Sequence, residues 1–163
     1  MTAALRIAVL GLAAAAVAGA ALARAGVEIV AVGEPYDALQ NTAETVAMLA
    51  RHNTAVMLWP VALVALGWAA IPVARHVGDA LIAGQLLAHG AVLGSALAQQ
   101  PGLWRYLTHL PLELAALIVP AAAWIAARRG TPITRTGLAG IAGVVVALVV
   151  AAAACETYLV PLP

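Results

Sequence analysis

The chain has 163 residues, of which 64% are hydrophobic and 9% are charged, and its formal net charge at pH 7 is +1. An average soluble domain carries about a quarter charged residues, so this composition predicts a polytopic membrane protein and excludes a large soluble catalytic domain. Scattered arginines without a basic stripe exclude nucleic-acid binding. The single cysteine, Cys155, excludes an intrachain disulfide.

Five hydrophobic segments follow one another along the chain, each close to the length that crosses a bilayer. They cover about residues 5–23, 54–74, 77–98, 107–127 and 136–160. The sequence therefore predicts a single all-α transmembrane domain over residues 1–163, a polytopic helix bundle of about five spans. The first segment also fits a secretory signal peptide, because Arg6 precedes an apolar run that ends in small residues before Arg24. We favour a retained span, with cleavage as the alternative.

The first outer loop, residues 24–53, is the longest polar stretch and includes Glu28, Glu34 and Glu44. Apolar residues recur at helical spacing over residues 37–51, which predicts a short amphipathic helix on the membrane surface. Asp37 would be its N-cap. The alternative is an ordinary connecting helix packed against the bundle.

Arginine residues near the span ends predict the orientation, because cytoplasmic flanks are enriched in basic residues. With the N-terminus inside, five arginines flank the inner ends of the spans and three flank the outer ends. This favours a plasma (inner) membrane protein with its N-terminus inside and its C-terminus outside. Trp124 then lies near the inner interface, as an aromatic anchor. Arg75 and Asp79, four residues apart, suggest a solvated ion pair at the same surface.

Two sets of glycines predict faces where helices approach closely, since small residues let backbones come together within a bilayer. The third span contains Gly84, Gly90 and Gly94, and the last span contains Gly137, Gly140 and Gly143.

Polar residues inside the apolar segments are candidate functional groups, because an ionisable residue at a span centre costs about 2.5–3.5 kcal/mol on insertion scales. The orientation places five of them in the outer half, as a polar intramembrane cluster: Asn53, His89, His109, Glu113 and Glu156. His109 and Glu113 are four residues apart on one helical face. Glu113 can cap the first turn of a helix that begins at Pro111. It can also bond Asn53 or His89 across helices, and both roles are compatible.

No catalytic constellation is evident in the sequence. The four histidines raise a haem or metal hypothesis, with His89 and His109 as the pair at comparable depth. A His-x-x-x-His pair, metal-spaced cysteines, a phosphate loop and a nucleophile elbow are all missing from the sequence. We therefore expect no enzyme activity, no cofactor and no metal ligands, and a haem protein is a third hypothesis.

The order of several short motifs resembles the stage II sporulation protein M family of integral membrane proteins. "RHN" opens the second span, "LAHGAVLG" lies in the third, "HLPLEL" opens the fourth and "ACETYLVP" closes the fifth. That family has recurrent Asn-Gly-x-x-x-Gly, Pro-His-Gly-x-x-Glu-Leu and Ile-Glu-Ala-x-x-x-Pro motifs. The matching positions here are His89-Gly90 with Gly94, His109 with Glu113-Leu114, and Glu156 with Pro161. His89 stands in place of the asparagine, and Thr108 and Leu110 stand in place of the proline and glycine beside the histidine.

The resemblance implies an all-helical, five-span, non-enzymatic membrane component. It would act as a scaffold or assembly subunit of a prokaryotic membrane complex, in the lipid bilayer with other membrane proteins or as a homo-oligomer. Relatives of the family occur beside ABC transporter ATPases or in circular bacteriocin export and immunity systems. The alternative function is therefore a membrane subunit of an ABC-type transporter or export system, with an ATPase as its partner.

Overall fold

The computed structural model describes residues 1–27, 29 and 42–159, apart from the side chain of Tyr106. This part of the chain forms five α-helices and two short 3-10 helices, which confirms the all-α prediction. The helices are α1 (Thr2–Arg24), α2 (Ala43–Ala65), η1 (Trp68–Ala70), α3 (Pro72–Gln99), η2 (Pro101–Tyr106), α4 (Leu110–Arg128) and α5 (Arg135–Leu159).

Within the described residues, four helices are long and apolar enough to cross a membrane: α1, α3, α4 and α5. The chain is therefore a multi-pass membrane protein. Helix α2 has 23 residues, but its first half contains Glu44, Arg51, His52 and Asn53. Those polar residues lower its hydropathy below that of the other four.

The start of α2 corrects the prediction for the first outer loop. The Thr42 side chain caps the helix by accepting a hydrogen bond from the Thr45 amide at 3.2 Å. No glycine or proline interrupts residues 43–59, so the helix continues through His52 and Asn53. The expectation of a separate amphipathic helix ending at Arg51 was therefore wrong, because residues 43–51 are the first turns of α2. Asp37, the expected N-cap, lies outside the described residues, as do Glu28 and Glu34.

The end of α2 also differs from the prediction, which placed the span end at residue 74. Gly67 has a φ of +72° and leads into the short helix η1. A left-handed backbone conformation is readily accessible to glycine but strained for other residues. Pro72 then begins α3. Hydropathy did not predict this turn, because the residues around it are themselves apolar.

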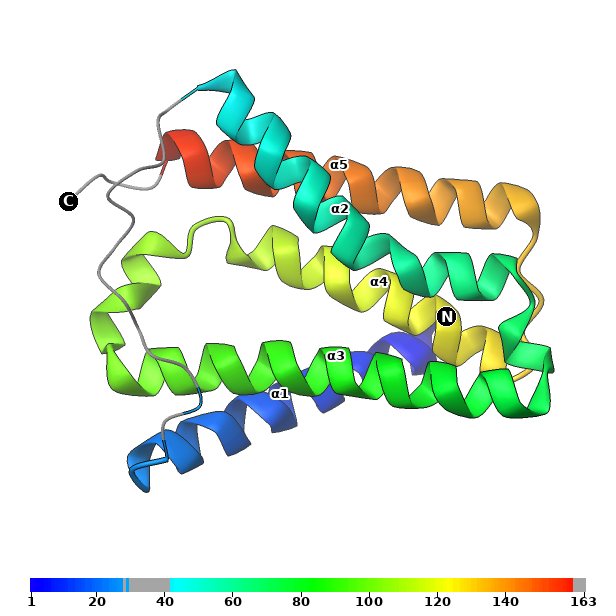
Figure 1. Ribbon diagram of the computed structural model, residues 1–163, viewed down its shortest axis with the longest axis horizontal. Helices are drawn as coiled ribbons and strands as arrows, with labels where there is room; N and C mark the ends of the chain where they lie inside the picture. Colours follow the sequence, from blue (N-terminus) through cyan, green and yellow to red (C-terminus); the bar gives the residue numbers. More distant parts are fainter. Residues whose placement is uncertain (28, 30–41, 160–163) are drawn as a thin grey trace.

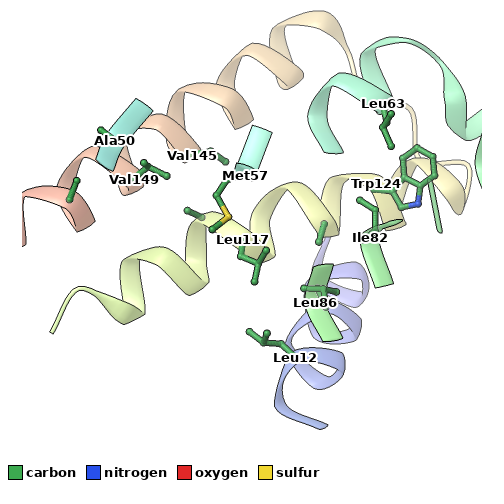
Figure 2. Packing of buried hydrophobic residues seen from close by; sticks show 14 residues of the cluster. Leu12, Ala50, Met57, Leu63, Ile82, Leu86, Leu117, Trp124, Val145 and Val149 are labelled. Atoms are coloured by element: carbon green, nitrogen blue, oxygen red, sulfur yellow. The ribbon is translucent and has the colours of Figure 1, made fainter. Parts of the chain in front are cut away.

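The helices lie side by side and alternate in direction. In Figure 1, α1, α3 and α5 run from right to left, whereas α2 and α4 run from left to right. Figure 2 shows the core between them, to which Met57 of α2, Leu117 of α4 and Val149 of α5 contribute. Trp124 of α4 is only 1% exposed at the other end of the core.

Helices α1 and α3 approach closely through glycine. A Cβ added at Gly90 would lie 2.6 Å from the Leu12 carbonyl oxygen and 2.6 Å from the Ala15 Cβ. Gly94 similarly abuts the backbone of Ala16. Gly19 of α1, which the sequence analysis did not single out, abuts the backbone of α3 in return. The bundle thus uses glycine as bilayer proteins commonly do, to bring two backbones together.

The other predicted glycines do not contact a neighbouring helix within the part of the chain that the structure describes. Gly84, Gly140 and Gly143 would leave an added Cβ with no neighbour within 4 Å, and Gly137 meets only Ile133 and Thr134 just before it. The reason on α5 is the position of its buried face, which contains Val145, Val149, Ala152, Ala153 and Thr157. The glycines of α5 lie before that buried stretch.

Candidate functional site

The start of α4 positions two of the predicted polar residues. His109 occupies the N-cap position, and Pro111 lies in the first turn, where its missing N–H costs no helical hydrogen bond. The imidazole Nε2 of His109 lies 3.9 Å from the Glu113 Oε2. That separation is an ion-pair distance and is too long for a hydrogen bond. His109 is 9% exposed, and the Glu113 side chain is 23% exposed.

Glu113 is hydrogen-bonded across helices. The Asn53 Nδ2 of α2 donates to the Glu113 Oε1 at 3.0 Å. His109 makes no side-chain capping bond at the start of α4. Glu113 itself lies in the first turn of α4, as its helix-capping role requires, and the structure also shows the interhelical contact with Asn53.

Glu156 of α5 completes this group. One ring nitrogen of His109 and one carboxylate oxygen each of Glu113 and Glu156 all lie within 4.8 Å of one another. We call Asn53, His109, Glu113 and Glu156 the outer polar cluster. Its members come from α2, from the N-cap and first turn of α4, and from α5, and none belongs to α1 or α3. The Nδ1 atom of His109 is buried and has no hydrogen-bond partner among residues 1–27, 29 and 42–159.

His89 lies apart from the outer polar cluster. It belongs to α3 and is half-buried, and its Nδ1 lies 2.9 Å from the Gln85 carbonyl oxygen one turn earlier. Because a carbonyl only accepts, this Nδ1 must carry the proton. His89 is near enough to Glu113 to interact with its charge, but it is not one of the three groups that converge.

A second polar site lies at the opposite end of the bundle. The prediction that Asp79 pairs with Arg75 was wrong, because Asp79 bonds to residues of α4. Its Oδ1 accepts from the Trp124 Nε1 at 2.9 Å and from the Arg128 Nε at 2.9 Å, and its Oδ2 accepts from the Arg128 Nη2 at 2.8 Å. A guanidinium matches a carboxylate with two parallel N–H donors. Trp124 is accordingly a buried donor and not the lipid-interface anchor that we expected.

The spacing of residues in the sequence gave only a weak indication of this site. Trp124 and Arg128 are four residues apart and share one face of α4. Their partner on α3 could not be identified without the packing of the two helices. Gln85 was also missed: its Nε2 donates to the Val56 carbonyl oxygen at 2.9 Å, which links α3 to α2.

Comparisons with protein-family models, with curated proteins and with solved structures give no match. The resemblance to the stage II sporulation protein M family therefore rests on the quoted motifs and stays a prediction. Pro161, the last residue of the third motif, lies outside the described residues.

Proposed function

We propose that this chain is a non-enzymatic scaffold or assembly subunit of a prokaryotic membrane complex. The observation that supports this most is the outer polar cluster, in which polar side chains of three helices contact one another inside an apolar bundle. Interhelical polar contacts of this kind fix how membrane helices pack. The resemblance to the sporulation protein family implies the same role.

The proposal includes α2 as a fifth span. Ala4 near the start of α1 packs against Ala126 near the end of α4, and Asp79 near the start of α3 bonds Arg128 there. Helices α1 and α3 thus begin at the same end of the bundle, so the chain must return between them, and Figure 1 shows α2 making that return. Its 23 residues measure about 35 Å at about 1.5 Å per residue, enough for a hydrocarbon core of about 30 Å.

An odd number of spans puts the two termini on opposite sides of the membrane. The arginine distribution then supports an N-terminus inside and a C-terminus outside in the plasma membrane. On this orientation the outer polar cluster lies toward the outer surface, and the Asp79–Arg128 pair lies toward the inner one.

A scaffold also needs surface for its partners. Large apolar side chains are exposed along α1 and α3, including Leu10, Val17, Val73 and Leu87. Lipid covers part of such a surface, and other membrane proteins or further copies of the chain are the expected partners for the rest. Gly84, Gly140 and Gly143 have room beside them for a neighbouring backbone.

The second candidate is a transport subunit, which the clustering of ionisable groups in the outer polar cluster favours. Energy would then come from an ATPase partner. The third candidate is a haem protein with His89 and His109 as axial ligands. An absorption spectrum of the purified protein that lacks a Soret band would exclude it.

Co-purification from the native membrane separates the scaffold from the transporter. Tagged wild-type chain should retain a stoichiometric partner, whereas Glu113→Gln should lose it, because the neutral side chain weakens the contacts that hold α4. Glu44→Gln is the matched control, since Glu44 is exposed on α2. An ATPase as the partner would contradict the scaffold and favour transport. The same holds if the Glu113→Gln variant still assembles with its partner but no longer transports its substrate.

A further inference from the structure

We propose that His109, Glu113 and Glu156 bind one divalent transition-metal ion, with Zn²⁺ as the ion that best suits this ligand set. The inference goes beyond the proposed scaffold function, which requires no bound ion. One imidazole and two carboxylates form a mixed nitrogen and oxygen set of a kind that zinc sites use.

The geometry of the three groups is close to that of a coordination sphere. With bonds of about 2.0–2.2 Å, neighbouring ligand atoms of a tetrahedral zinc ion are roughly 3.3–3.6 Å apart. The three candidate atoms already lie within 4.8 Å of one another. The His109 Nε2 and the Glu113 Oε2 are 3.9 Å apart. Binding an ion would require the side chains to rotate enough to close the remaining difference.

Charge balance favours a cation at this place. Glu113 and Glu156 bring two partly buried carboxylates together within an apolar bundle, where like charges repel strongly. Asn53 is neutral, and the nearby groups that can carry a positive charge are the imidazoles of His109 and His89. Among the described residues, Arg128 is the arginine that forms a salt bridge. Its partner is Asp79, and the pair lies at the other end of the bundle. A divalent ion neutralises both carboxylates at once.

His109 is the nitrogen ligand of the proposed site. Its side chain is buried, and its Nε2 faces the Glu113 Oε2 at 3.9 Å, which is too long for a hydrogen bond. Its Nδ1 has no hydrogen-bond partner among the described residues. Buried polar atoms in proteins are nearly always bonded, so a buried imidazole held in this way beside two carboxylates calls for a partner. A metal ion bound through Nε2, between the ring and the carboxylates, would be that partner.

Asn53 would orient one ligand. By donating to the Glu113 Oε1, it leaves the other oxygen, Oε2, directed toward His109. Hydrogen bonds to the ligands of a metal ion commonly hold them in this way. The sequence analysis placed these three residues in one polar group, but its expectation of no metal ligands depended on local spacing, and Glu156 is 43 residues from Glu113 in sequence and on another helix.

The test is direct titration of the purified full-length chain in detergent, after chelator treatment. Zn²⁺ binding is measured by competition with a chromophoric chelator, and Co²⁺ is added separately as a spectroscopic probe. We expect one Zn²⁺ per chain, and visible Co²⁺ absorption of a low-symmetry nitrogen and oxygen site. His109→Gln, Glu113→Gln and Glu156→Gln should each weaken Zn²⁺ binding at least about tenfold.

Two controls make the result decisive. His52→Gln and Glu44→Gln remove exposed potential ligands from α2 and should leave the affinity unchanged. Each variant is also checked for helical content and for a single gel-filtration peak, and the wild-type Co²⁺ spectrum stands even where a variant misfolds. Wild-type binding that is absent, or that falls equally in His52→Gln, overturns the proposal. Neither result concerns the scaffold function, because assembly is measured separately by co-purification.

Discussion

Replacing Gly90 by alanine tests whether close contact between α1 and α3 stabilises the bundle. The added Cβ would lie 2.6 Å from the Leu12 carbonyl oxygen and from the Ala15 Cβ, whereas ordinary contacts begin at 3.4 Å. The two helices must therefore separate locally by roughly 0.8 Å, the difference between those distances. Neither neighbour can rotate away, because one is backbone and the other is an alanine methyl group.

The expected cost follows from overpacking, which destabilises proteins by about 1–3 kcal/mol. A gap of this size also forfeits about a quarter to a half of the attraction between the separated atoms. Glycine-to-alanine substitution raises helix propensity by roughly 1 kcal/mol, which opposes the loss. Gly84→Ala is the matched control, because Gly84 lies on the same helix and has no neighbour within 4 Å.

The free energy of unfolding of the two variants is compared by denaturant titration in mixed micelles. Gly90→Ala should be less stable than Gly84→Ala by about 1–3 kcal/mol. Equal stabilities would refute the conclusion that glycine at this position permits the contact. Since the propensity change is common to both variants, their difference isolates the contact with α1.

Three further changes test the turn, the inner polar site and the orientation. Gly67→Ala should lower the unfolding free energy by about 1–2 kcal/mol because of the positive φ at that residue, and Gly102→Ala should not. Asp79→Ala should lower the thermal midpoint further than Asp79→Asn, which keeps an acceptor for Trp124; equal midpoints would contradict that hydrogen bond as a source of stability. In a Cys155→Ser background, an impermeant thiol reagent on intact cells should label Gln100→Cys but not Ala70→Cys, and labelling of Ala70→Cys would contradict the proposed orientation.

The sequence predicted the helical class well, since hydropathy reports which segments prefer lipid to water. It failed at α2 in two ways. The polar residues from Glu44 to Asn53 suggested a surface segment, but their backbone continues one helix with the apolar residues that follow. The turn at Gly67 lies inside an apolar run, where hydropathy does not change.

The candidate site shows the same division. Residue type and position along each span brought His109, Glu113 and Glu156 into one predicted group, because depth in the membrane follows from counting residues. Helix rotation does not follow from that count. Only the packed structure places the Asn53 amide on Glu113 and leaves His89 apart from the converging groups.

By itself, the sequence determined that this protein is a helical membrane protein with ionisable groups toward one end of its spans. Tertiary structure decided which of those groups meet, and which partners Asp79 and the glycines of α3 have. The physical reason is that transfer into lipid depends on each segment alone, whereas hydrogen bonds and close backbone contacts depend on the relative rotation and crossing of two helices.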